Sequence, residues 1–95
     1  MKLIRDKYIN IIEKERLDVA DEYELKINLI LDKIKEEIVE YLESDCEDPM
    51  ELADVMQAVI DLGNLHGHDF ELVDKLRKQK EAELGGFTDF IILKD

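Results

Sequence analysis

The chain has 95 residues, of which 13 are Lys or Arg and 25 are Asp or Glu, so its net charge at pH 7 is −12. Charged residues make up 40% and apolar residues 45%, a balance typical of a globular domain and not of a disordered chain. The acidic surface argues against nucleic acid and anionic membranes as partners, because both repel it. We expect one domain, residues 1–95, with a thin core, because a chain of this size buries only about two-thirds of its unfolded surface.

Cysteine content and hydropathy indicate the compartment. The only cysteine, Cys46, excludes an intrachain disulfide and fits a reducing environment. The first residues, MKLIRDKYIN, lack the apolar core of a signal peptide, and no apolar run approaches the length that spans a membrane. These features predict a cytoplasmic protein.

Capping residues and apolar spacing divide the first half of the chain. Asp6 is a candidate N-cap for a short helix across Tyr8–Arg16, and Leu17–Asp21 is expected to be a loop. From Glu22 to Glu43, apolar residues recur every three or four positions and form one stripe of a helix. The residues of this stripe are Ile27, Ile30, Leu31, Ile34, Ile38, Tyr41 and Leu42.

A second long helix is predicted for Pro49–His66. Asp48 is placed to cap it, Pro49 suits its first position, and Glu51 stands at the third. Apolar residues cover most of its circumference, so we expect it to be the central and largely buried helix. Gly67 suits the left-handed position that ends a helix.

The last part of the chain holds one further helix and a tail. Asp69 caps a helix over Phe70–Leu84, which Gly85 ends. The tail, Phe87–Leu93, is rich in strand formers and is a candidate partner for a short strand at Lys2–Arg5. The predicted fold is therefore an all-α helical hairpin or bundle, with a short two-strand pairing of the termini.

The apolar surface of Pro49–His66 also predicts an assembly. A chain of 95 residues is too short to cover a helix that is apolar on nearly all sides. We therefore expect at least a homodimer, either a dimer or a dimer of dimers.

The residues most informative about chemistry are acidic and lie on the two long helices. Glu37 and Glu40 project together, as do Glu36 and Glu40, and the next helix carries the pair Glu51 and Asp54. An antiparallel hairpin of the two helices would bring these carboxylates face to face. Carboxylates in one cleft repel each other unless cations neutralise them, and hard divalent ions such as Mg²⁺ are their natural occupants.

Simpler interpretations of the same residues remain open. The chain has so many acidic residues that pairs at helical spacing are expected from composition alone. Glu51 has a capping role with Asp48, and Glu36 lies farthest from the apolar stripe and suits a solvated face. Asp54 is harder to explain in this way, because it lies in the most apolar helix and a buried lone carboxylate is costly.

These features together resemble the MazG-like superfamily of all-α nucleoside triphosphate pyrophosphatases, which includes phosphoribosyl-ATP pyrophosphohydrolase and dimeric dUTPases. Its signature is EExxE followed on the next helix by ExxD, and the matching residues here are Glu36, Glu37, Glu40, Glu51 and Asp54. The ends are similar to one subgroup, with a KLVRDK-type start at Lys2–Lys7 and a K-x-x-E-R-G-G-F ending at Lys80–Phe87. Leu84 departs from the arginine usual in that ending, and the connection between the two acidic motifs is shorter than in most of the superfamily.

The resemblance implies an activity: Mg²⁺- or Mn²⁺-dependent hydrolysis of a nucleoside triphosphate between its α- and β-phosphates, giving a monophosphate and pyrophosphate. The implied metal ligands are Glu37, Glu40, Glu51 and Asp54. Glu36 and Glu37 are the implied catalytic residues, with Glu36 either a further ligand or the base that orients the attacking water. The implied role is removal of non-standard or surplus nucleotides.

Phosphate groups also require cationic partners. Arg77, Lys78 and Lys80 form the densest basic run of the chain, and Arg5 and Lys7 are second candidates. The alternative for the basic run is a favourable interaction with the C-terminal end of its own helix dipole.

Three competing functions stay open at this point. The chain could be a non-catalytic acidic helical protein that binds a basic partner, or a degenerate relative that binds nucleotide without turnover. A hydrolase that releases orthophosphate in place of pyrophosphate is the third.

Overall fold

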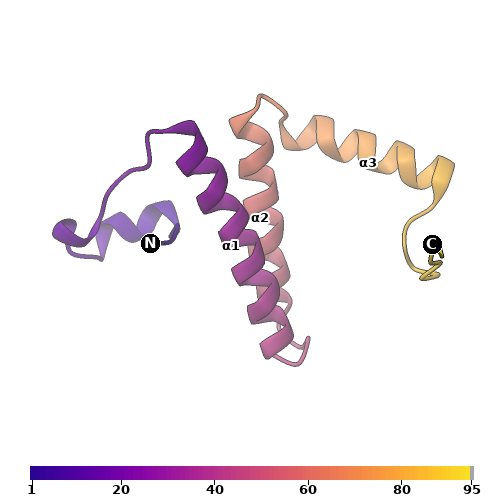
Figure 1. The fold of residues 1–95 in the computed structure, drawn as a ribbon, viewed down its shortest axis with the longest axis horizontal. Helices are drawn as coiled ribbons and strands as arrows, with labels where there is room; N and C mark the ends of the chain where they lie inside the picture. Colours follow the sequence, from indigo (N-terminus) through magenta and orange to yellow (C-terminus); the bar gives the residue numbers. More distant parts are fainter. Residues whose placement is uncertain (95) are drawn as a thin grey trace. The chain divides into compact units, whose positions relative to one another are not determined.

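A computed structural model describes residues 1–94, and within them every regular element is helical. Three α-helices follow one another, α1 (Tyr23–Glu43), α2 (Pro49–Leu65) and α3 (Phe70–Leu84), as Figure 1 shows. Two short 3-10 helices, η1 (Asp6–Asn10) and η2 (Lys14–Arg16), precede them. The all-α prediction is confirmed. The chain groups into two units, Met1–Leu62 and Gly63–Asp95, which are described separately.

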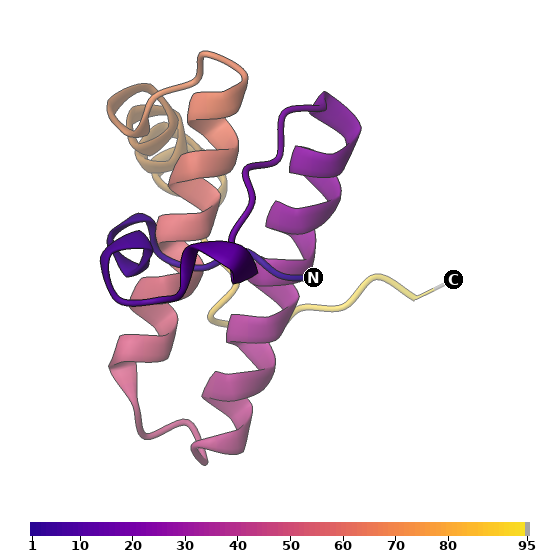
Figure 2. The ribbon, with the colours of Figure 1, turned by 90° about the vertical axis from the view of Figure 1, so that its left-hand side faces the viewer.

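Helices α1 and α2 form an antiparallel hairpin and lie side by side in both views (Figures 1 and 2). Leu29 of α1 and Ala58 of α2 are its buried apolar residues, 8% and 4% exposed. The core is thin because two helices alone can cover only one face of each other.

A short turn, residues 44–48, joins the two helices. The Ser44 hydroxyl donates to the Tyr41 carbonyl at 2.6 Å, which satisfies one of the last carbonyls of α1. Asp45 and Cys46 both have left-handed backbone angles, with φ of 57° and 60°. The carboxylate of Asp48 then accepts from the Met50 amide at 3.0 Å, as expected of an N-cap.

The prediction that Pro49–His66 is largely buried is wrong for the chain as it stands. Leu52, Met56 and Val59 share one face of α2 and are all exposed, Met56 by 58%. Helix α1 lies along one side of this helix within the unit (Figures 1 and 2), and the face that carries Leu52, Met56 and Val59 stays exposed. The apolar pattern of the helix shows that its surface can be buried, but it does not show which element packs against that surface.

Helix α3 begins and ends where the sequence predicts. The Asp69 carboxylate accepts from the Leu72 amide at 2.9 Å, and Gly85 follows the last turn with a φ of 81°. Both signals depend on neighbouring residues only, which is why this helix could be read directly from the sequence.

The terminal segments differ from expectation. The helix predicted over Tyr8–Arg16 is replaced by η1 and η2, and the loop predicted at Leu17–Asp21 is confirmed. The predicted strand pairing is wrong, because neither Lys2–Arg5 nor Phe87–Leu93 forms a strand. Two strands of this length are marginal without further cover.

The chain turns back tightly over the end of α2. The amides of His66 and His68 both donate to the Gly63 carbonyl, at 3.0 and 2.8 Å. A Cβ atom on Gly63 would lie 2.5 Å from the His68 carbonyl oxygen, closer than such atoms approach. Gly67, with a φ of 76°, completes the turn in the left-handed region.

We predict that Gly63→Ala destabilises the protein. The added methyl group must displace the His68 backbone, and the expected loss in unfolding free energy is about 1–2 kcal/mol after the gain in helix propensity is counted. Gly86→Ala is the matched control, because no atom lies within 4 Å of the added Cβ. Thermal unfolding followed by circular dichroism compares the two variants, and equal melting temperatures would contradict the prediction.

Candidate metal centre

Three carboxylates meet at the end of the hairpin that holds the turn. Glu37 and Glu40 lie about one turn apart on α1, and Glu51 lies in the first turn of α2. One oxygen atom from each of the three lies within 4.8 Å of the others. The short turn produces this meeting, because it places the start of α2 beside the last turns of α1. The pairing of the two acidic motifs across a hairpin was predicted from the sequence.

Glu37 is the buried member of this group, which we call the carboxylate cluster. It is 7% exposed, and its Oε1 atom receives a long contact of 3.5 Å from the Lys33 ammonium. Its Oε2 atom is buried without a hydrogen-bond partner among the described residues, and the same holds for Glu51 Oε2. Buried carboxylate oxygens without donors are costly, so these two atoms favour a bound cation or a shared proton.

The pKa values of Glu37 and Glu51 show the same cost of placing ionised carboxylates together. Burial raises the pKa of Glu37 to about 7, and hydrogen bonding to Glu51 and Glu40 adds to the rise. The hydrogen bond with Glu37 lowers the pKa of Glu51, but desolvation and the neighbouring Glu40 and Asp48 carboxylates raise it by more. The cluster therefore favours either a shared proton or a bound cation near neutral pH.

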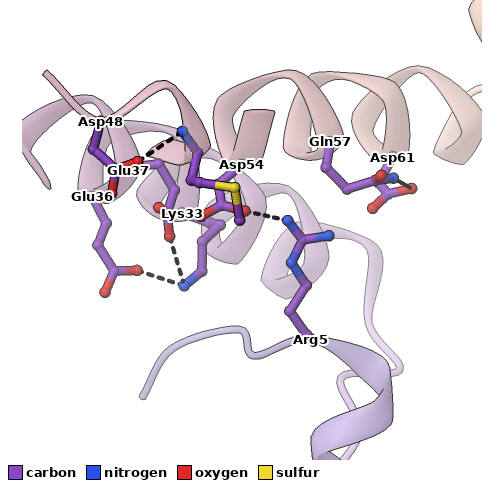
Figure 3. Close-up of polar contacts among 9 residues, drawn as sticks. Arg5, Lys33, Glu36, Glu37, Asp48, Asp54, Gln57 and Asp61 are labelled. Carbon is purple, nitrogen blue, oxygen red and sulfur yellow. Dashed lines mark hydrogen bonds and ion pairs between the residues drawn. The ribbon is translucent and has the colours of Figure 1, made fainter. Parts of the chain in front are cut away.

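Glu36 lies outside this group. Its two oxygens pair with Lys33 at 2.7 Å and with Lys2 at 3.3 Å, as the close-up in Figure 3 shows for Lys33. The hydrogen bond from Lys33 lowers the pKa of Glu36, and Lys2 contributes in the same direction. Glu36 is thus an ionised carboxylate at neutral pH, and its role as ligand or base stays a prediction.

Asp54 also lies outside the three. It is located about one turn of α2 after Glu51, and its carboxylate forms an ion pair with the Arg5 guanidinium (Figure 3). Its charge still acts on Glu37, whose pKa it helps to raise. The fourth predicted ligand is therefore next to the carboxylate cluster and held by a cation of the N-terminal segment.

Lys33 is a site residue that the sequence analysis missed. Its ammonium lies between Glu36 and Glu37 and is the cation closest to the buried carboxylate (Figure 3). Burial lowers the pKa of Lys33, but the pairs with both glutamates raise it by more. The signal was present, since Lys33 precedes Glu36 by three positions and Glu37 by four on one helix.

The predicted phosphate-binding cations lie in two places. Arg77, Lys78 and Lys80 belong to α3, in the second unit. Arg77 and Lys78 pair with Asp74 at 2.8 and 3.2 Å and hold the pKa of Asp74 below its usual range, so part of their charge is already neutralised. In the first unit, Arg5 binds Asp54 and Lys7 lies exposed in η1.

The donor set suits a hard divalent cation. Mg²⁺ and Mn²⁺ bind carboxylate oxygens and retain water ligands, and three converging carboxylates with two unpartnered oxygens meet this requirement. The carboxylate cluster contains neither a histidine nor the thiol of Cys46, which are the ligands that zinc and copper prefer, so these metals fit it less well.

No known protein family, curated protein or solved structure matches the chain. Among residues 1–94, no helix has the length and the apolar character needed to cross a bilayer. Any functional assignment therefore depends on the chemistry of the residues themselves.

We predict that the metal-free protein loses stability as the pH rises from about 5 to 8. The pKa of Glu37 is raised from 4.5 to about 7 in the folded state. The stability that comes from its bound proton is therefore complete below the pKa of the unfolded chain, 4.5, and is lost as the pH passes 7. The groups facing Glu37 are the carboxylates of Glu40, Glu51 and Asp54, the ammonium of Lys33 and the guanidinium of Arg5.

Urea unfolding in chelator-treated buffer measures this dependence. Glu37→Gln is the control, because the amide has nearly the same shape and does not titrate, so its profile should be flatter across this range. A wild-type stability that is constant or rises over the same range contradicts the prediction.

Proposed function

We propose that this chain is a metal-dependent nucleotide pyrophosphohydrolase of the MazG-like kind. The observation that carries the proposal is the carboxylate cluster of Glu37, Glu40 and Glu51, with two buried oxygens that lack donors. The sequence resemblance adds the reaction: water attacks phosphorus, the bond between the α- and β-phosphates breaks, and a monophosphate and pyrophosphate leave. The lone exposed Cys46 is consistent with a cytoplasmic location, which stays part of the proposal.

The proposed roles depend on the surroundings of each residue. Glu37, Glu40 and Glu51 would hold Mg²⁺, with Asp54 as a fourth ligand once it is free of Arg5. A bound Mg²⁺ supplies charge neutralisation for phosphate oxygens and a lower pKa for water. Glu36 stays ionised beside Lys33 and Lys2 and so can accept a hydrogen bond from a water molecule.

We predict that the purified protein with Mg²⁺ converts a nucleoside triphosphate into its monophosphate and pyrophosphate, and that Glu51→Gln abolishes this turnover. Replacing one carboxylate of the three removes a ligand without a change of size. Glu47→Gln, an exposed residue in the turn, is the matched control and should retain activity. Chromatography of products from a panel of standard and modified nucleotides measures the outcome.

The same panel distinguishes the alternatives. Orthophosphate as the product would assign a different bond, and nucleotide binding without turnover would indicate a degenerate relative. Neither binding nor turnover would favour an acidic interaction protein, for which the net charge of −12 is the supporting observation.

Metal binding itself has a readout that needs no substrate. Mg²⁺ or Mn²⁺ should raise the melting temperature of the wild type. The expected gain in unfolding free energy is about 2.7 kcal/mol when the ion concentration is a hundredfold above its dissociation constant. Glu51→Gln should lose most of this shift, while Glu47→Gln keeps it. A melting temperature that is insensitive to both ions would remove the physical basis of the proposal.

We further propose that two copies associate through the uncovered face of the hairpin. Leu52, Met56 and Val59 line one face of α2, and the exposed apolar residues of α1 include Leu31 and Ile38. Exposed apolar residues on both helices are typical of an interface, and a second copy of the hairpin would complete a four-helix bundle.

We predict that the wild type is at least a dimer at micromolar concentration and that Met56→Glu shifts it toward monomer, because a charge is then buried in the interface. Val19→Glu, at an exposed position in the loop before α1, is the control and should leave the assembly intact. Light scattering after size exclusion measures the mass. A stable wild-type monomer contradicts the proposal and would indicate that this face is covered from within the chain or left in solvent.

A further inference from the structure

The segment before η1, residues 1–5, is attached to both helices of the hairpin. Lys2 pairs with Glu36 of α1 at 3.3 Å, and Arg5 pairs with Asp54 of α2. Leu3 and Ile4, between them, are half-buried, and the segment crosses the hairpin in Figure 2. Both ion pairs are formed with carboxylates of the two acidic motifs, so cationic side chains of the N-terminal segment lie beside the carboxylate cluster.

Arg5 lies at the edge of the carboxylate cluster. Its guanidinium pairs with Asp54 and also feels the charge of Glu37. The charge of Asp54 in turn acts on Glu37. Asp54 is about one helical turn from Glu51, yet it is not among the three carboxylates that converge. The Arg5 side chain is the group that holds it (Figure 3).

We infer that Arg5 is a positioning residue that competes with a divalent cation for Asp54. When Asp54 binds Arg5 it is withheld from the cluster, and when a divalent ion is bound there Asp54 joins Glu37, Glu40 and Glu51 and releases the guanidinium. The release leaves Arg5 beside the ion, where it can pair with an anionic ligand such as a phosphate group. This inference rests on the metal centre proposed above.

The size of the effect depends on exposure. The side chains of Arg5 and Asp54 are 51% and 34% exposed, so their ion pair is solvent-screened and easily exchanged. Arg5→Ala should therefore tighten Mn²⁺ binding by about three- to fivefold and no more. Arg5→Lys keeps the charge and should bind Mn²⁺ about as the wild type does.

The experiment is a double-mutant cycle measured by calorimetric titration with Mn²⁺ in the absence of nucleotide. The proteins are the wild type, Arg5→Ala, Asp54→Asn and the variant with both changes. If Arg5 acts through Asp54, Arg5→Ala tightens binding in the wild type and has little effect when Asp54 is already Asn. Lys14→Ala removes a charge elsewhere in the same N-terminal part, in η2, and should leave Mn²⁺ affinity nearly unchanged.

The outcomes separate the inference from the function on which it rests. Equal tightening by Arg5→Ala in both backgrounds would show a general charge effect and overturn the inference while the metal centre stands. Unchanged affinity in Arg5→Ala overturns it as well. No Mn²⁺ binding by any of the four proteins, with melting curves showing that all are folded, overturns the metal centre and the inference together.

Discussion

The mutual repulsion of three carboxylates is the constraint around which the first unit is organised. The α1–α2 hairpin can close only by bringing Glu37, Glu40 and Glu51 together, and it has little apolar burial with which to offset that cost. Cations of the chain engage the neighbouring acids, Lys33 and Lys2 at Glu36 and Arg5 at Asp54. None of them provides a short contact to the buried Oε2 atom of Glu37. A fold that keeps such an arrangement gives up stability at one place, which is typical of sites selected for function.

The helices were predictable to the extent that their ends are set locally. Asp48, Asp69 and Gly85 act on the backbone within one turn of themselves, and the structure has helix ends at these positions. The terminal segments were not predictable in this way. Lys2–Arg5 has the composition of a strand, but its structure depends on what it meets in space, and the hairpin offers it carboxylates in place of a strand edge.

The same distinction applies to the candidate site. Glu37, Glu40 and Glu51 could be placed together from helical spacing and a hairpin, and the Lys33 contacts are expected from spacings of three and four. The pair of Arg5 and Asp54 joins residues 49 positions apart, and no local pattern reports it. The prediction that α2 is buried was wrong for a related reason. Its apolar residues show that the helix can be covered, but whether it is covered depends on the element that packs against it.

The start of α2 has a consequence for how this chain can vary. Each residue added to or removed from a helix rotates the rest of that helix by about 100°, so a change of length between Pro49 and Glu51 would turn Glu51 to another side of α2. Glu51 lies in the first turn of α2, so a single helical residue inserted just before it would carry its carboxylate away from Glu37. Replacement of exposed turn residues such as Asp45 and Glu47 leaves that register intact. In this chain the position of Glu51 relative to Glu37 thus depends on the helical register at the start of α2 and not on the identity of the turn residues.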